Sequence, residues 1–298
     1  MSKRDYAFWV KLASWSTMAL VSLMILTKVW AWLTTGSAAM LGSLTDSLMD
    51  ITATLMNFFV LRYALRPADD DHRFGHGKAE SLAGLGQAAF IAGSGCLLAF
   101  HGVERLINPS TVSNTGIGIG VSVFAIVCTL AIVLVQNQVI KQTNSIAIKA
   151  DSIHYKGDLI LNASVILAMV LAYYGWLQAD GFFAIAVAGY LLFNAWQVAL
   201  ESADHLMDKE LPEEEKSQIL SWVCSHEQVH GAHDLRTRQA GQIKFVQLHI
   251  ELDDHLPLVQ AHKVTDEIVA ILTNKMSGQI DVLIHQDPVS VVLRSKNS

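Results

Sequence analysis

Charged residues are scarce in this chain of 298 residues. Asp, Glu, Lys and Arg make up only 16% of it, whereas 52% is hydrophobic and the mean hydropathy is +0.35. A soluble globular domain carries about a quarter charged residues, so this composition argues against an ordinary soluble protein. We therefore expect a membrane protein.

Cysteine and basic charge are also sparse. Cys96, Cys128 and Cys224 lie far apart and form no CxxC pair, so we interpret them as small buried hydrophobic residues rather than disulfides or thiolate ligands. The formal net charge of −6 makes a nucleic-acid partner unexpected, because such a partner needs a basic stripe. An HExxH pattern is missing too, which argues against an intramembrane metalloprotease.

Six long apolar stretches occupy the first two thirds of the chain. Each reaches the ~20 mostly apolar residues that a helix needs to cross a bilayer. The breaks between them are short and rich in Gly, Pro, Asn and Asp, which suits turns. Residues 1–207 are thus predicted to form an all-α transmembrane domain of six helices. The stretches cover approximately residues 8–33, 37–65, 81–107, 116–140, 145–173 and 178–202.

Basic residues predict the orientation of these helices. They gather at the N-terminus and in the even-numbered loops, and the odd-numbered loops offer little beyond Arg105. Since positive residues stay in the cytoplasm, both termini should be cytoplasmic. Lys28 lies late in the first span, and we expect it to snorkel towards the outer interface. The basic residues of the N-terminus and even-numbered loops are Lys3, Arg4, Arg62, Arg66, Arg73, Lys78, Lys141 and Lys149.

The last ninety or so residues have a different character. A helix is predicted to start at Pro212, followed by two alternating runs, HDLRTRQ and IKFVQLHIEL, on either side of an Ala-Gly turn. An amphipathic helix over about 258–274 and a strand in QIDVLIHQD complete the pattern. The order αββαβ predicts that residues 208–298 form a compact α+β domain with helices on one side of its sheet.

Two pairs of ionisable residues interrupt the apolar stretches. Asp46 and Asp50 in the second span, and His154 and Asp158 in the fifth, are each separated by one helical turn and so share a helix face. Both pairs should lie ~13–20 Å into the membrane at 1.5 Å per residue. Three carboxylates and one imidazole around a common point are a ligand set for a four-coordinate divalent transition metal.

Two alternatives concern the same segments. The aspartates could instead form hydrogen bonds with polar neighbours such as Thr45, Asn57 and Asn162, and only hold helices together. Asp151, one turn before His154, could orient the imidazole or line an access path, or it could be an acid of the first helical turn near the membrane surface.

Taken together, these features resemble those of a known family. Six spans, DxxxD in the second, HxxxD in the fifth and the αββαβ tail are similar to the cation diffusion facilitators, and the resemblance covers about residues 5–288. That resemblance implies a cytoplasmic domain of the metallochaperone-like type. The segments that carry it are LTDSLMD, DHRFGHGKAE, ADSIHYKGD, HDLRTRQAG and IHQDP.

The resemblance implies three metal sites. The transport site would use the four residues of the two spans. A second site, in the loop between the second and third spans, would use Asp69, His72 and His76, although the loop reads DDDH and the choice among Asp69, Asp70 and Asp71 stays open. Without the resemblance this loop could be a solvated acidic turn. A binuclear cytoplasmic site would use His233, His249, His262, His285 and Asp287.

The strand pattern supports the cytoplasmic site independently. Val246, Leu248, Ile250 and Leu252 alternate towards a core and leave His249 on the opposite face of the sheet. In the last strand, Ile280, Val282 and Ile284 likewise alternate inward, so that His285 and Asp287 share the other face. Imidazoles and a carboxylate gathered on a face away from the core suit a metal cluster.

These features predict an antiporter of the bacterial inner membrane that exports a divalent metal in exchange for protons, and the resemblance implies that it is a homodimer. Zn²⁺ is the first choice for the transported and the structural metal, with Fe²⁺, Cd²⁺ and Mn²⁺ as alternatives. The resemblance also implies an ion pair between Lys78 and Asp208 that holds the membrane and cytoplasmic parts of the dimer together. The competing hypothesis is a membrane-anchored metal sensor that transports nothing.

Overall fold

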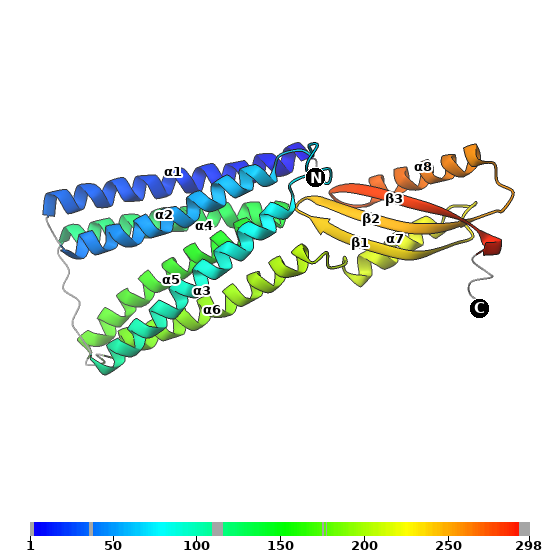
Figure 1. The fold of residues 1–298 in the computed structure, drawn as a ribbon. Helices are drawn as coiled ribbons and strands as arrows, with labels where there is room; N and C mark the ends of the chain where they lie inside the picture. The colour runs from blue at the N-terminus through cyan, green and yellow to red at the C-terminus, as the bar shows by residue number, and fades with distance from the viewer. Residues whose placement is uncertain (1–2, 36–37, 109–115, 175, 177, 292–298) are drawn as a thin grey trace. The chain divides into compact units, whose positions relative to one another are not determined.

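The computed structural model describes residues 3–35, 38–108, 116–174, 176 and 178–291 (Figure 1). The predicted break at 109–115 lies outside the described residues, as do some side chains within helices, that of Asp46 among them. The chain divides into two compact units. One comprises Ala7–Ala203, and the other comprises Asp204–Ser298 together with Met1–Tyr6.

Six long helices make up the larger unit, one at each predicted apolar stretch. They extend past most of the predicted boundaries, because polar residues at both ends continue the helical hydrogen bonding beyond the apolar segments. The helices are α1 (Lys3–Thr35), α2 (Ala38–Ala64), α3 (Lys78–Ile107), α4 (Gly116–Thr143), α5 (Ile146–Tyr173) and α6 (Ala179–Leu206).

Four of these helices contain a described segment that is long and apolar enough to cross a membrane: Asp5–Thr34, Lys78–Ile107, Val123–Thr143 and Ala179–Leu206. These four segments are confined to the described residues, and α2 and α5, the helices that carry the predicted transport site, contain residues outside that description.

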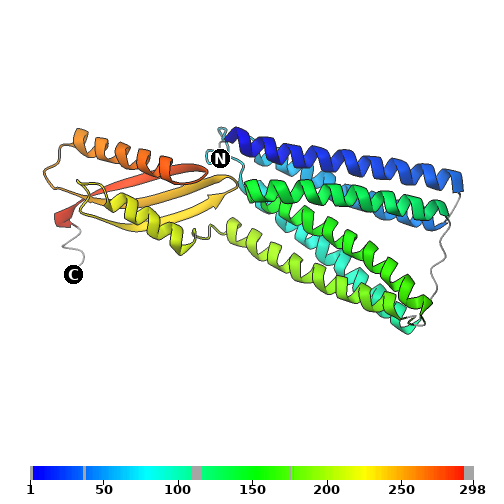
Figure 2. The ribbon, with the colours of Figure 1, turned by 180° about the vertical axis from the view of Figure 1, so that it is seen from behind.

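The helices of the larger unit form two groups. Figures 1 and 2 show α1, α2 and α4 on one side and α3, α5 and α6 on the other, with the groups diverging towards one end. Between the groups, α4 packs against α5 and α2 packs against α3, while α2 and α5 meet over a shorter stretch.

Small residues allow α3 and α6 to approach closely. A Cβ added to Gly181 of α6 would lie 2.7 Å from the carbonyl oxygen of Gly102 in α3. Only glycine fits such a backbone contact, and small residues serve this purpose in membrane helix packing. Ile91 of α3, Ile153 of α5 and Val198 of α6 belong to the same buried cluster.

The smaller unit has the predicted order of elements. It consists of α7 (Glu213–Cys224), β1 (Gly231–Ala240), β2 (Ile243–Leu252), α8 (Leu258–Lys275) and β3 (Gln279–Pro288). The sheet order is β1-β2-β3, with β1 and β2 antiparallel and β2 and β3 parallel. The crossover through α8 makes the parallel pairing possible.

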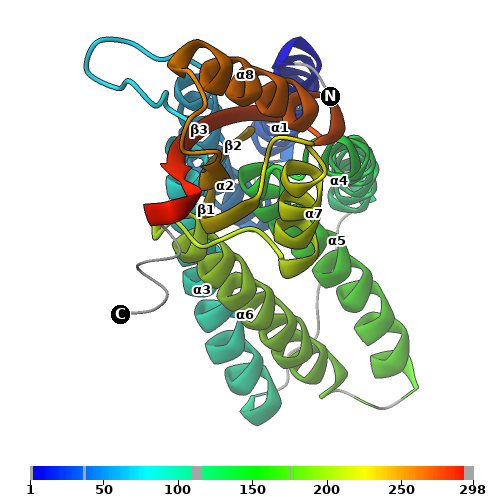
Figure 3. The same cartoon turned by 90° about the vertical axis from the view of Figure 1, so that its right-hand side faces the viewer.

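Both helices of this unit cover one face of its sheet (Figure 3). The predicted inward residues of β2 are all buried, and they pack with Ile219 of α7 and Ile268 of α8. Ile280, Val282 and Ile284 of β3 pack against the same core while staying partly exposed. The opposite face carries His249 in β2, as the alternation predicted.

Two expectations were wrong. Cys96 and Cys224 are exposed rather than buried, and only Cys128 lies inside, since the helical faces that carry the other two are not covered within this chain.

Lys28 does not snorkel: its Nζ donates a hydrogen bond to Ser47 Oγ at 2.5 Å. Ser47 is buried in α2, so this hydrogen bond turns the ammonium group of Lys28 towards the neighbouring helix.

Replacement of a core residue of α8 should destabilise the smaller unit. We expect Ile268→Ala, at a fully buried side chain, to lower its free energy of unfolding by about 2–5 kcal/mol through lost burial and a cavity. Amide hydrogen exchange of β2 and β3 in the full-length protein measures this. Val259→Ala, on the same helix but with a side chain 81% exposed, is the control and should change little. Equal protection loss in both variants would contradict this account of the core.

Candidate metal centres

The transmembrane cluster joins α2 and α5. His154 Nε2 lies 3.3 Å from Asp50 Oδ1 and 3.7 Å from Asp158 Oδ2. One ligand atom from each of these three residues lies within 4.8 Å of the others, close enough to hold one metal ion. The structure therefore brings together three of the four predicted residues, while Asp46 lies in α2 one turn before Asp50, with its side chain outside the described residues.

Hydrogen bonds between helices set the register of this cluster. The hydroxyls of Thr54 in α2 and Tyr155 in α5 lie 2.7 Å apart, and Thr54 Oγ1 also donates to the backbone oxygen of Asp50 at 3.1 Å. The ring of Phe90 in α3 stands edge-on to His154. Tyr155 and Thr54 were missed by the sequence analysis, because a hydroxyl pair between two helices leaves no pattern in either one.

Two of the alternative partners of the aspartates, Asn57 and Asn162, bond elsewhere, and the side chain of the third, Thr45, lies outside the described residues. Asn57 Nδ2 donates to the backbone oxygen of Ala147 at 3.4 Å, and Asn162 Nδ2 donates to that of Asp158 at 2.8 Å. Among the described side chains, the carboxylate of Asp50 contacts His154 instead. The polar neighbours thus join or cap backbone turns and leave the carboxylate oxygens facing the imidazole.

The loop between α2 and α3 folds around Asp69. His72 Nδ1 lies 3.2 Å from Asp69 Oδ1, and His76 Nε2 lies 3.3 Å from Asp69 Oδ2. The side chain of His76 is only 2% exposed, and its Nδ1 lies 3.2 Å from the backbone oxygen of Pro67, which orients the ring. A positive φ of 81° at Gly75 allows the chain to turn between the two histidines.

The geometry favours Asp69 over its two neighbours as the acid of this loop. Asp70 points away and pairs with Arg73 at 2.9 Å, with its side chain 94% exposed. Asp69 instead accepts a hydrogen bond from the backbone N–H of His72 at 2.7 Å. This backbone hydrogen bond is the main reason that the pKa of Asp69 lies below its usual value, so the carboxylate stays ionised over the neutral range.

The cytoplasmic cluster lies on the face of the sheet opposite the core. His249 Nδ1 is 2.7 Å and His233 Nε2 is 3.4 Å from the same oxygen, Oδ2 of Asp287. The strand register explains this, because His249 is paired with His233 on β1 and with His285 on β3. His285 Nε2 lies 3.3 Å from Asp287 Oδ1. Four of the five predicted residues are thus neighbours.

His262 lies apart from this cluster. It is on α8, which packs on the other face of the sheet, and its Nε2 lies 3.5 Å from Asp266 on the exposed side of that helix. Within this chain the structure does not bring His262 together with the four residues on the sheet. The reason is geometric, because a three-stranded sheet separates the two positions.

Two acids near the cytoplasmic cluster were missed by the sequence analysis. Glu251 Oε1 lies 3.3 Å from His233 Nδ1, and Asp234 Oδ2 lies 3.7 Å from His249 Nε2. Asp234 reaches this position because β1 has an irregular register between His233 and Arg236 and a φ of 47° at Asp234. Such a bulge redirects a side chain, and the alternation of a regular strand cannot reveal it.

Loss of the Asp69 carboxylate should open the loop. Asp69→Asn should speed amide exchange at His72, since a neutral amide accepts that hydrogen bond less strongly than a carboxylate does. Because the pKa of Asp69 is lowered in the folded protein, its contribution should be complete above the ordinary value of 3.8 and disappear as the pH falls through the lowered one. Asp70→Asn, which touches only Arg73, is the control. Equal exchange in both variants would refute the role of Asp69.

Comparisons with known proteins match nearly the whole chain. A family model described as the cation efflux transmembrane domain matches residues 14–207, and one described as the cytoplasmic domain of cation efflux proteins matches 211–289. The chain is 45% identical over 291 residues to the cation-efflux pump FieF of Escherichia fergusonii, covering 98% of this chain and 97% of that protein. The protein of the same name from Escherichia coli strain K12 / DH10B gives the same identity and coverage.

Solved structures of related domains match a shorter part. The metal-bound C-terminal domain of the CzcD transporter from Thermotoga maritima is 26% identical, with a TM-score of 0.25, over 26% of this chain and 95% of that one. The zinc form of CzrB is 29% identical, with a TM-score of 0.27, over 28% and 94%. The two family models and the full-length relatives decide the assignment. The chain belongs to the cation efflux family, the cation diffusion facilitators, and is a multi-pass membrane transporter rather than an enzyme.

Proposed function

We propose that this protein exports a divalent metal ion from the cytoplasm in exchange for protons, with Zn²⁺ as the preferred cargo. The observation that carries the proposal is the contact between Asp50, His154 and Asp158 across α2 and α5. Ionised side chains inside membrane helices are costly, and they mark ion pathways when they face one another. Asp46 would supply the fourth ligand from the preceding turn of α2.

The same residues can hold either metal or protons. A metal ion requires the neutral imidazole of His154 and ionised carboxylates, so protonation competes directly with binding. A cytoplasm near neutral pH favours metal loading, and a more acidic exterior favours release. Alternating access would follow from movement of α2 and α5 against the other helices. One nitrogen and three oxygens also suit Fe²⁺, Cd²⁺ and Mn²⁺, which stay alternatives.

The two other centres have donor sets that suit a bound metal. Two imidazoles and one carboxylate, with ligand atoms within 4.8 Å, occur both at Asp69, His72 and His76 and at His233, His249 and Asp287. In the cytoplasmic cluster, His285 would be a ligand of a second ion, whereas the predicted ligand His262 lies on the other side of the sheet within this chain. A metal there would neutralise the acids gathered on the sheet face and stabilise the cytoplasmic domains, which we propose pair in a homodimer.

The membrane arrangement follows from the same proposal. All six helices α1–α6 would cross the bacterial inner membrane, with both termini in the cytoplasm. Residues 1–207 would form the transport domain and residues 208–298 the metal-binding domain, a division supported by the two family-model matches. The proposed Lys78–Asp208 pair would connect protomers at this junction. Within the smaller unit, Asp208 also pairs with Arg238 at 3.3 Å.

A membrane-anchored metal sensor is the alternative function. Such a sensor would bind metal at the cytoplasmic cluster, and the transmembrane cluster would have no function in it. The sensor hypothesis therefore does not explain why imidazole and carboxylates face one another between α2 and α5. Transport measurements distinguish the two functions directly.

Removal of a carboxylate from the transmembrane cluster should abolish transport. In proteoliposomes with an imposed pH gradient, we expect Asp50→Ala to reduce Zn²⁺ flux at least about tenfold, because even indirect partners of a metal affect its binding by that factor. Glu104→Ala, which removes an exposed carboxylate at the end of α3, is the control and should keep its flux. Normal flux in Asp50→Ala would mean that the pathway lies elsewhere. Absence of flux in the intact protein would favour the sensor.

Zinc should stabilise the cytoplasmic unit through its own cluster. At a zinc concentration of 100 times the dissociation constant, the free energy of unfolding should rise by about 2.7 kcal/mol. Hydrogen exchange of β1 and β2 in the full-length protein measures this gain, and His249→Ala should remove it. His255→Ala, at an exposed histidine outside the cluster, is the control. A gain that survives in His249→Ala would place zinc binding elsewhere.

A further inference from the structure

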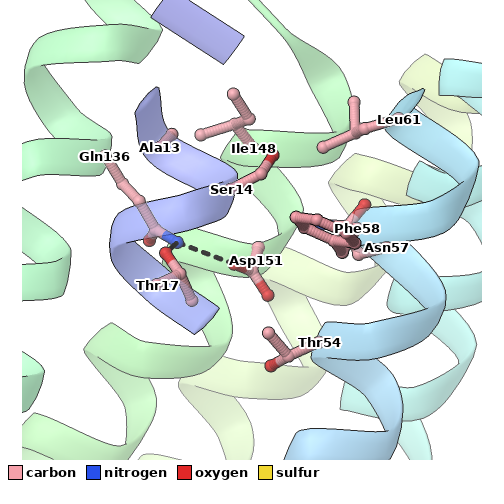
Figure 4. A pocket seen from close by; sticks show the side chains of 10 residues that line it. All are labelled: Ala13, Ser14, Thr17, Thr54, Asn57, Phe58, Leu61, Gln136, Ile148 and Asp151. Carbon is pink, nitrogen blue, oxygen red and sulfur yellow. Dashed lines mark hydrogen bonds between the residues drawn. The ribbon is translucent and has the colours of Figure 1, made fainter. Parts of the chain in front are cut away.

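A small polar pocket lies between α1, α2, α4 and α5, in addition to the three candidate metal centres. Its cavity volume is about 10 Å³, which is room for roughly one water molecule. The polar residues that line it include Thr17, Thr54, Asn57, Gln136 and Asp151 (Figure 4). Asp151 is the one ionisable residue in this lining, and the proposed transport mechanism does not use it.

Gln136 holds one oxygen of the Asp151 carboxyl group. Gln136 Nε2 donates to Asp151 Oδ2 at 2.7 Å and to Thr17 Oγ1 at 3.1 Å, as Figure 4 shows for the first bond. Both bonds require the amide nitrogen, so Oε1 of Gln136 must be an acceptor. Asp151 itself is only 4% exposed. The hydrogen bond of Asp151 therefore goes to α4, and not to His154, which lies one turn further along α5.

Three buried oxygens of the pocket residues have no hydrogen-bond partner among the described residues: Asp151 Oδ1, Asn57 Oδ1 and Gln136 Oε1. The orientation of Asn57 is set by its own bond, since its Nδ2 donates to the backbone oxygen of Ala147. All three atoms are acceptors. What they require is hydrogen atoms, and buried polar groups are rarely left unsatisfied.

One proton and one water molecule together supply three hydrogen atoms, one for each of these oxygens. A proton on Asp151 Oδ1 could be donated to the water oxygen, and the two water hydrogens could be donated to Asn57 and Gln136. The cavity volume accommodates this single molecule. A proton also removes the charge of the carboxylate, which is unfavourable in an apolar bundle without a paired cation.

Charged groups around the pocket do not supply such a cation. The residues of α1, α2 and α4 that line it are polar or apolar and include no Lys, Arg or His. On α5, the imidazole of His154 lies against the carboxylates of Asp50 and Asp158 instead. No ion pair of Asp151 is found among the described side chains. A neutral carboxyl group is the state that fits this surrounding.

We propose that this pocket is a second proton-binding site, in which Asp151 carries a proton that it shares with one bound water between Asn57 and Gln136. Thr54, which also lines the pocket, bonds to Tyr155 and to the backbone of Asp50, so hydrogen bonds connect the pocket to the turn that carries the transport site. A role of this proton in export would rest on the proton antiport proposed above. The existence of the proton-binding site does not depend on that proposal.

Infrared difference spectra of the full-length protein in lipid, between H₂O and D₂O at neutral pH, test this inference. A protonated buried carboxyl group gives a C=O band that is separate from carboxylate and amide bands and shifts in D₂O. We expect this band in the wild type, its loss in Asp151→Asn and a shifted band in Gln136→Leu, which removes the donor to Oδ2. Asp281→Asn, at an exposed acid of β3, is the control and should keep the band.

Three outcomes would overturn the proposal. Identical spectra in the wild type and Asp151→Asn would mean that Asp151 is ionised. A band that disappears when choline chloride is replaced by sodium chloride would identify an alkali cation site instead. An unshifted band in Gln136→Leu would separate Asp151 from the pocket. A failure of proton-driven flux in the wild type would affect only the antiport, because the spectra do not depend on transport.

Discussion

Every ionisable group inside an apolar helix bundle needs a partner, and this requirement shapes the larger unit. The contact of His154 with Asp50 and Asp158 is its main expression, since it joins α2 and α5 within a bundle in which ionised side chains are costly. The hydroxyl pair of Thr54 and Tyr155 then holds the two helices in the register that the contact needs.

The smaller unit places the same kinds of side chain in a different environment. Its acids and imidazoles are not enclosed by apolar helices but lie on the sheet face that the core leaves uncovered. Parallel pairing of β2 and β3 places His249 beside His285, and antiparallel pairing places it beside His233. A flat array of imidazoles around Asp287 is the result. Such an array suits a metal that stabilises the domain, whereas a cluster between movable helices suits a metal that passes through.

Much of this arrangement could be predicted from residue spacing. The i, i+4 pairs in α2 and α5 required only that both segments be helical, and the alternation in β2 placed His249 on the outer face. Residue spacing did not predict the hydrogen bond of Lys28, because its partner Ser47 lies on another helix. Asp234 and Glu251 were missed for a related reason, because a bulge and a neighbouring strand bring them to the histidines. The resemblance grouped His262 with the histidines and Asp287 of the cytoplasmic cluster, but the sheet lies between His262 and those residues.

The sequence by itself determined the class of protein, the number and positions of the long helices, the order of elements in the cytoplasmic domain and the residue types of each centre. These depend on composition and on local periodicity, which every stretch of chain carries within itself. Tertiary structure decided which acid of the DDDH loop meets the histidines, which hydroxyls align α2 with α5, and that Asp151 turns to Gln136 rather than to His154. Those choices depend on contacts between distant segments, and no local pattern encodes them.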